Sequence, residues 1–161
     1  MTVLIVILTG IVLIFGFVVI RGAPYVPTLT RQADAALSLL DLKSGQTLLE
    51  VGSGDCRVLR AAAKKGLKVV GYELNPILVL ISIIVTWKYR KRVTIIWGDY
   101  WNAKWPKTDG VYTFLLDKYM KKLDKKIVQE YGKNVKLVSF AFKIPGRKVA
   151  SEKNGLFLYN Y

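Results

Sequence analysis

A glycine-rich turn flanked by carboxylates is the part of this sequence best suited to hold a charged small molecule. Residues 47–51 form a short apolar run, which predicts a buried strand, and the run ends at Gly52-Ser53-Gly54. From Asp55 onward the apolar residues are spaced as in a helix. We expect a turn between strand and helix to leave backbone N–H groups pointing at a ligand above the sheet edge, and glycine allows that ligand to approach the backbone. The turn therefore predicts a nucleotide-type site.

Two cofactor classes use such a turn, dinucleotides and S-adenosylmethionine. A dinucleotide fingerprint requires a third glycine, and this chain has Arg57 at that position. Glu50, two residues before the first glycine, would repel a pyrophosphate but suits the ammonium group of a methionine moiety. We therefore expect S-adenosylmethionine as the cofactor.

Three further carboxylates follow predicted strands. Glu73 ends the strand predicted at 67–74 and lies 21 positions after Gly52 (73 − 52), the spacing of the acid that takes ribose hydroxyls in such folds. Asp99 follows the next strand and could accept a hydrogen bond from an adenine amino group. We hypothesise that Asp117 orients the acceptor amine, and the alternative is an N-cap for the helix that follows it.

The elements that must position these residues alternate along the chain. Strands are predicted at 47–51, 67–74, 93–97, 111–116 and 136–142, and helices at 29–40 (with Thr28 as N-cap), after Asp55, at 77–89 and at 118–131. The tail from 148 to 161 reads as a hairpin with an Asn-Gly turn. The pattern predicts an α/β fold, a doubly wound Rossmann-like sheet with an antiparallel C-terminal hairpin. Its ligand crevice should lie beyond the carboxyl ends of the strands.

The first 20 residues contain no charged side chain. Residues 2–20 as a helix would span roughly 28 Å, close to the hydrocarbon thickness of a bilayer. We therefore expect a single transmembrane helix over 1–21 that anchors a domain over 22–161. Because Lys and Arg lie only on its C-terminal side, the domain should face the cytoplasm or its matrix equivalent.

The amino-acid composition excludes several classes of site and indicates the charge of the partner. The chain has no histidine and one cysteine, Cys56, which excludes Ser-His and Cys-His hydrolases, an intramolecular disulfide and most zinc sites. The net charge of +14 predicts an acidic partner: anionic lipid headgroups, an acidic protein face or nucleic acid. For an anchored protein an anionic membrane surface is the simplest of these. A lysine stripe on the helix at 118–131 could dock to such lipids or could simply be solvated.

Several motifs together give the chain a family resemblance. They are Pro24-Tyr-Val-Pro-Thr28, Gly52-Ser-Gly-Asp55 with Arg57, Gly71-Tyr-Glu-Leu-Asn-Pro76, Asp99-Tyr-Trp101 and the strand ending in Ile144-Pro-Gly146. With these, the chain resembles the class I (seven-β-strand) S-adenosylmethionine-dependent methyltransferases. More narrowly, it is similar to membrane-anchored protein lysine methyltransferases, whose mitochondrial members methylate the ATP synthase c-subunit and the adenine nucleotide translocase.

The resemblance implies roles for individual residues. Those implied to bind the cofactor are Glu50, Gly52, Ser53, Gly54, Asp55, Arg57, Glu73, Asn75, Asp99 and Tyr100. Those implied to lie near the substrate are Tyr25, Pro27, Thr28 and Trp101. Two positions depart from the family pattern. Cys56 stands where the family usually has glycine, and Asp117 stands where it usually has an apolar residue or proline.

The resemblance implies a membrane-anchored enzyme that methylates lysine in an integral membrane protein. Two alternatives stay open: methylation of RNA or of a small molecule, and a non-catalytic module that only binds S-adenosylmethionine. The Asn-Pro-Pro-Tyr loop of enzymes that methylate nucleic-acid amino groups is absent after the fourth strand, where Leu115-Leu-Asp-Lys118 stands. We therefore do not expect nucleic acid as the partner.

Overall fold

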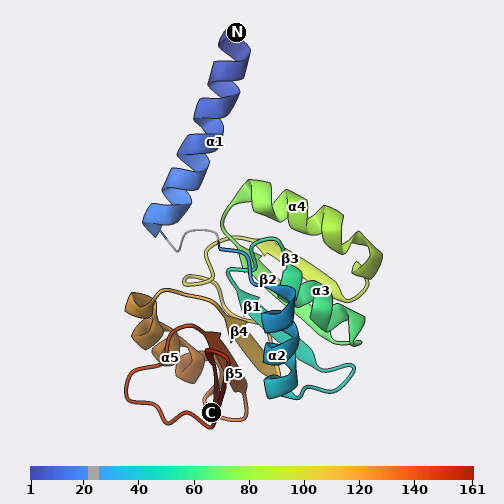
Figure 1. The fold of residues 1–161 in the computed structure, drawn as a ribbon, viewed down its shortest axis with the longest axis vertical. Helices are drawn as coiled ribbons and strands as arrows, with labels where there is room; N and C mark the ends of the chain where they lie inside the picture. The colour runs from blue at the N-terminus through green and yellow to red at the C-terminus, as the bar shows by residue number, and fades with distance from the viewer. Residues whose placement is uncertain (22–25) are drawn as a thin grey trace.

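A seven-stranded sheet with helices on both faces makes up the body of the protein (Figure 1). The computed structural model describes residues 1–21 and 26–161, and it describes the side chains of the first helix only in part. The elements are α1 (Thr2–Arg21), α2 (Thr30–Leu40), β1 (Thr47–Val51), α3 (Arg57–Lys64), β2 (Lys68–Glu73), α4 (Pro76–Thr86), the 3₁₀ turn η1 (Trp87–Tyr89), β3 (Val93–Trp97), β4 (Gly110–Thr113), α5 (Asp117–Tyr131), β5 (Lys136–Phe140), β6 (Ser151–Lys153) and β7 (Leu156–Asn160).

The strand order is β3-β2-β1-β4-β5-β7-β6. Strands β1 to β5 are parallel, whereas β7 runs antiparallel to β5 and pairs with β6. The turn between β6 and β7 places Asn154 and Gly155 at positive φ, as a two-residue hairpin requires. The predicted fold class is therefore confirmed. Because β1 is central, the carboxyl ends of β1, β2 and β4 meet at one edge of the sheet.

Each face of the sheet has its own apolar core. On one face α2 packs against α3, β5 and β7, α3 packs on β1 and β2, and α4 packs on β2 and β3 (Figure 1). On the other face α5 buries Met120, Leu123 and Ile127 at helical spacing. A parallel sheet covered on both sides needs strands that are apolar on both faces, and β4 is fully buried along its length.

The start of α2 differs from the prediction that Thr28 caps it. The helix begins at Thr30, and the backbone N–H of Leu29 donates to Oε1 of Gln32 at 3.1 Å, so the cap position belongs to Leu29. The side chain of Thr28 is instead buried, and its hydroxyl shares a 3.3 Å hydrogen bond with the hydroxyl of Tyr112 in β4. This bond holds the segment before α2 on the sheet edge. The prediction failed because the Thr28 hydroxyl is bonded to Tyr112 and the helix starts one residue later than expected, with Leu29 as its cap residue.

Within the parts of the chain that the structure describes, no helix combines the length and the apolar character needed to cross a bilayer. The predicted transmembrane anchor over 1–21, and the membrane localisation and orientation based on it, are therefore wrong. A hydrocarbon core of about 30 Å requires about 20 consecutive apolar residues in one helix.

Gly71 in β2 offers a test of how tightly the glycine turn is seated. A Cβ at position 71 would overlap the side chain of Leu59 and lie 2.9 Å from the Cβ of Ser53. We expect Gly71→Ala to lower the free energy of unfolding by about 1–3 kcal/mol, the usual cost of overpacking, as measured by urea denaturation. Gly98→Ala is the matched control, since a Cβ there would meet nothing within 4 Å. Equal stabilities of the two variants would contradict this packing.

Candidate functional site

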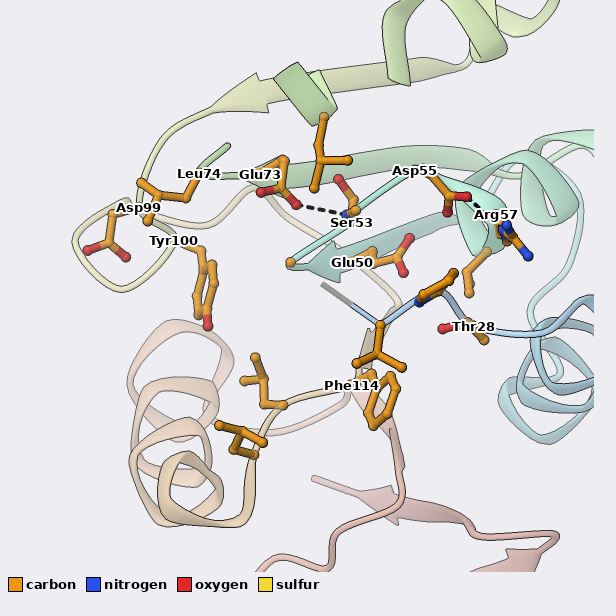
Figure 2. A pocket seen from close by; sticks show the side chains of 18 of the residues that line it. Thr28, Glu50, Ser53, Asp55, Arg57, Glu73, Leu74, Asp99, Tyr100 and Phe114 are labelled. Carbon is orange, nitrogen blue, oxygen red and sulfur yellow. Dashed lines mark hydrogen bonds and ion pairs between the residues drawn. The ribbon is translucent and has the colours of Figure 1, made fainter. Parts of the chain in front are cut away.

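One cavity lies beyond the carboxyl ends of β1, β2 and β4, as the fold predicts (Figure 2). It encloses about 1040 Å³, including space open to solvent. The described residues that line it come from the segment before α2 (26–28), from β1 and the turn that follows it (50, 52–55, 57, 58), from the end of β2 and the start of α4 (73, 74, 78), from the loop after β3 (99–101) and from the loop after β4 (114–116). Thr28, Glu50 and Phe114 lie toward one end, and Asp99 and Tyr100 lie at the other.

The glycine turn (residues 52–54) is bonded to β2. Gly52 and Gly54 adopt positive φ, which explains the glycines. The backbone N–H groups of Gly52 and Ser53 both donate to the carbonyl of Tyr72, at 3.0 and 2.9 Å. The N–H of Gly54 donates to Oε2 of Glu73 at 2.8 Å. The expectation that these amides point at a ligand is therefore wrong. Because they are used inside the protein, the turn does not offer them as a pyrophosphate cradle.

Glu73 joins the turn to α4. Its Oε1 accepts the backbone N–H of Asn75 at 2.8 Å, while its Oε2 accepts from Gly54. Burial raises the pKa of Glu73, and these backbone hydrogen bonds oppose that rise. Each carboxylate oxygen can accept more than one hydrogen bond, so Glu73 can hold the turn and still accept from a ligand hydroxyl.

Asn75 does not line the cavity. It is buried and caps α4, since its Oδ1 accepts the N–H of Ile77 at 2.9 Å. Its contribution to the site is indirect, because its own backbone N–H fixes Glu73. The implied direct contact of Asn75 with the cofactor therefore stays a prediction.

Glu50 is the most unusual group in the cavity. It is 4% exposed, and its Oε2 has no hydrogen-bond partner among the described residues. Burial is the main cause that raises the pKa of Glu50 well above its usual value, and the nearby carboxyls of Asp55 and Glu73 raise it further. A buried acceptor left unpaired is costly unless a donor arrives. A ligand ammonium group fits this requirement.

The other end of the cavity is built on Asp99. Its Oδ1 accepts the N–H of Trp101 at 2.8 Å and its Oδ2 accepts from the side chain of Asn102 at 3.0 Å, so the loop after β3 folds around this carboxylate. Tyr100 is nearly buried, and its carbonyl accepts the indole N–H of Trp105 at 2.8 Å. These bonds place Asp99, Tyr100 and Trp101 together on one wall.

The cavity is acidic although the chain is strongly basic. Among the described residues that line it, Glu50, Asp55, Glu73 and Asp99 carry carboxyls, and Arg57 carries the opposite charge. The Nε of Arg57 lies 2.6 Å from Oδ2 of Asp55, so this pair largely cancels (Figure 2). In a chain with a net charge of +14, such a cavity favours a cation over a polyphosphate. S-adenosylmethionine, with its sulfonium and ammonium groups, meets this condition.

The structure brings most of the predicted site residues together. All of the implied cofactor-binding residues except Asn75 line the cavity, as do Pro27, Thr28 and Trp101. Tyr25 lies outside the described residues. Asp117 is exposed at the first position of α5 and is not among the residues that line the cavity, so its role in orienting an amine stays a prediction. Leu116 occupies the cap position before it, which leaves Asp117 to interact with the positive end of the helix.

Sequence reasoning missed several residues of the site. Ser82 in α4 is fully buried and donates to the carbonyl of Gly54 at 2.8 Å, so it fixes the turn from the side of α4. A serine in an otherwise apolar helix was the only signal for it. Leu78 and Phe114 supply apolar walls, and no motif marked them. Leu74 also lines the cavity; it lies within the Gly71–Pro76 motif, but no role was assigned to it. Tyr112 reaches the site only through Thr28.

Comparison with known proteins agrees with this geometry. The family model described as ANTKMT methyltransferase domain matches residues 50–151. The chain belongs to this family. It is 33% identical to the human lysine N-methyltransferase of the ATP synthase c-subunit over 124 residues, which is 76% of this chain and 53% of that protein. It is 32% identical to the mouse adenine nucleotide translocase lysine N-methyltransferase over 125 residues, with 76% and 54% covered. The chain thus spans about half the length of these relatives.

Solved structures extend the comparison. An RNA methyltransferase from Salinibacter ruber, crystallised with S-adenosyl-L-homocysteine, matches with a TM-score of 0.77 and 26% identity, covering 84% of this chain and 92% of that one. A methyltransferase from Thiobacillus denitrificans with the same ligand matches with a TM-score of 0.61 at 17% identity, covering 75% and 53%, which supports the fold alone. The predicted family, the methyltransferase fold and the cofactor class are therefore confirmed for the ANTKMT domain.

The unpaired Glu50 predicts a pH-dependent stability. Because its pKa is raised on folding, the folded chain keeps a proton that the unfolded chain has lost, so stability falls as pH rises from the usual glutamate pKa toward the raised one. We expect Glu50→Gln to stabilise the cofactor-free protein by about 1–3 kcal/mol at pH 8, with the gain disappearing near pH 4. Urea denaturation at both pH values measures this.

Glu152→Gln is the control for this experiment. Glu152 is exposed and paired with Lys143 at 2.8 Å, so we expect a change within about 0.5 kcal/mol at either pH. A Glu50→Gln protein less stable than the parent at pH 8 would contradict the described environment of Glu50.

Proposed function

We propose that this chain is an S-adenosylmethionine-dependent protein-lysine N-methyltransferase whose acceptor is a lysine of a membrane-associated protein. The observation that carries the proposal is the acidic cavity, with the unpaired Glu50 beside Glu73, in a domain of the ANTKMT family. The names of the human and mouse relatives, which are lysine methyltransferases of the ATP synthase c-subunit and of the adenine nucleotide translocase, support the acceptor class.

Different residues of the cavity bind different parts of the cofactor. Glu50, once ionised, pairs with the ammonium of the methionine moiety, and Glu73 accepts from the ribose hydroxyls while it holds the glycine turn. Asp99 accepts from the adenine amino group beside Tyr100. When bound, S-adenosylmethionine supplies an electrophilic methyl group on a sulfonium. The protein's contribution is mainly alignment, which can supply roughly 7–11 kcal/mol in favourable cases.

The acceptor must lose a proton before it can react, since only the neutral amine has a free lone pair. A lysine amine has a pKa near 10.4 in water, and the chain has no histidine to act as a base. We therefore assign the proton to water and keep Asp117 as the predicted orienting group. The predicted anionic membrane surface remains a second partner that the net charge of +14 supports.

RNA is a second candidate acceptor. The Salinibacter neighbour is described as an RNA methyltransferase and aligns over 92% of its length, and the basic charge of this chain would suit a polyanion. The loop after β4, Phe114-Leu-Leu-Asp117, lacks the Asn-Pro-Pro-Tyr pattern of enzymes that methylate nucleic-acid amino groups. The lysine proposal is therefore preferred.

Methyl labelling distinguishes the candidates. The full chain is incubated with tritiated S-adenosylmethionine and either membrane fractions, total RNA or purified ATP synthase c-subunit in detergent, and labelled products are analysed by mass spectrometry. We expect label on lysine of a membrane-fraction protein. Label in RNA alone would replace the proposal by the second candidate. Binding of the cofactor without any label would leave a non-catalytic binding module.

Glu73→Ala tests the cofactor part of the proposal. The variant loses a carboxylate that accepts two hydrogen bonds within the protein and would accept the ribose hydroxyls. We expect the affinity for S-adenosyl-L-homocysteine, measured by calorimetry, to fall at least about tenfold, with labelling lost in parallel. Glu152→Ala, an exposed position, is the control. Unchanged binding by a folded Glu73→Ala protein would refute the assigned site.

A further inference from the structure

Trp101 lines two hollows at once. It belongs to the wall of the cofactor cavity and also to a separate surface depression between the loop after β3 and α5. The depression is lined by Trp101, Asn102, Ala103, Lys104, Lys122, Lys125, Lys126, Gln129 and Glu130. The indole of Trp101 is therefore shared by the surface depression and the cofactor cavity.

The indole of Trp101 already binds a lysine. The Nζ of Lys122 lies 4.2 Å from the centroid of the indole ring, within the range of a cation–π contact. The rings of Tyr100 and Tyr119 flank the indole at 4.8 and 5.9 Å, so three aromatic rings form a continuous wall. The electron-rich face of such a wall attracts ammonium groups, and it attracts methylated ammonium groups as well.

Charges of both signs lie around the indole. From α5 come Lys118, Lys122, Lys125, Lys126 and Glu130, from the loop after β3 come Asp99 and Lys104, and from the cavity floor come Glu50 and Glu73. The Nζ of Lys126 lies 2.9 Å from Oε1 of Glu130, so these two charges are paired. The Asp99 carboxylate accepts a hydrogen bond from the backbone N–H of Trp101 in its own loop. In the surface depression an additional ammonium group therefore faces Lys104, Lys122 and Lys125, whereas the carboxyls of Glu50 and Glu73 lie on the cavity side of the indole. Like charges nearby lower the pKa of an amine.

We propose that Trp101 is the platform on which the acceptor lysine lies as it enters the cavity, and that Lys122 acts as a positioning residue that keeps the acceptor amine neutral. The inference rests on the proposed lysine methylation. The amine first releases its proton to water. Its lone pair then forms the new N–C bond with the methyl carbon, and the electron pair of the broken S–C bond stays on sulfur. The charge of Lys122 thus favours the neutral amine in a site that has no histidine base.

A binding experiment tests the platform without any turnover. Butyltrimethylammonium, which resembles a methylated lysine side chain, is titrated into the cofactor-free full chain and its binding is followed by isothermal titration calorimetry, which does not depend on the indole as a reporter. In Lys122→Gln we expect the affinity to rise about three- to tenfold, because the ring is freed and a like charge is removed. In Trp101→Leu the signal should disappear. Lys121→Gln is the control, since Lys121 is exposed on the same helix and does not line the depression.

The pH dependence of labelling tests the second part of the proposal, the role of Lys122. The rate rises with pH as the acceptor loses its proton, and in Lys122→Gln the midpoint should move up by about half to one pH unit. Lys122→Arg keeps the charge and should keep the parent profile, as should Lys121→Gln. A Lys122→Gln profile that superimposes on the parent, or an equal shift in Lys121→Gln, would overturn the role of Lys122.

The two experiments also separate this inference from the proposed function. If no acceptor is labelled, the proposed function fails, and the ammonium titration still tests Trp101. If lysine is labelled but Trp101→Leu binds the probe as the parent does, the platform fails alone. That the Trp101→Leu protein is folded is verified by its circular dichroism spectrum and by a cooperative urea denaturation curve.

Discussion

The site depends on one carboxylate that holds two backbone segments in place. Glu73 accepts the N–H of Gly54 on one oxygen and the N–H of Asn75 on the other, each at 2.8 Å. The first bond fixes the glycine turn after β1, and the second fixes the start of α4. Ser82, farther along α4, donates a hydrogen bond to the carbonyl of Gly54. The glycine turn, the end of β2 and α4 are therefore held together by hydrogen bonds. A ligand that binds Glu73 thus binds to a site that is already formed.

A second constraint is electrostatic. Burying Glu50 without a hydrogen-bond partner for its Oε2 costs free energy of folding. This residue lies near the carboxyl end of β1. The same carboxyl becomes favourable when a cation pairs with it. An acidic interior in a chain of net charge +14 separates two tasks: the cavity selects a cationic cofactor, while the lysine-rich outer surface faces an acidic partner. The aromatic wall at Trp101 lies where these two regions meet.

Much of the fold and of the site could be predicted from the sequence, because both depend on local patterns of residues. Apolar runs ending in Gly52-Ser53-Gly54, in Glu73 and in Asp99 marked strand ends, and parallel strands must bring those ends together. The C-terminal hairpin was predicted because its turn residues, Asn154 and Gly155, are neighbours in the sequence and favour the positive φ that the turn requires.

Contacts between distant residues were not predictable. Thr28 was expected to cap α2, but it bonds to Tyr112, 84 positions away, and Ser82 reaches Gly54 across 28 positions. The amides of the turn were expected to face a ligand, because the sequence does not reveal that β2 accepts them. The anchor over 1–21 was inferred from the length and the apolar composition of that segment, and the described structure does not bear it out.

Burial favours the protonated form of Glu50, and the central claim is that its carboxyl gives up a proton to pair with the ammonium group of a cationic ligand. Calorimetry of S-adenosyl-L-homocysteine binding at pH 7, repeated in buffers of different ionisation enthalpy, measures it most directly because it counts protons. If Glu50 ionises to pair with the ligand ammonium, binding to the parent protein releases a proton to the buffer, and binding to Glu50→Gln releases none. Binding to the parent with no dependence on the buffer, or the same proton release in the variant, would contradict the account.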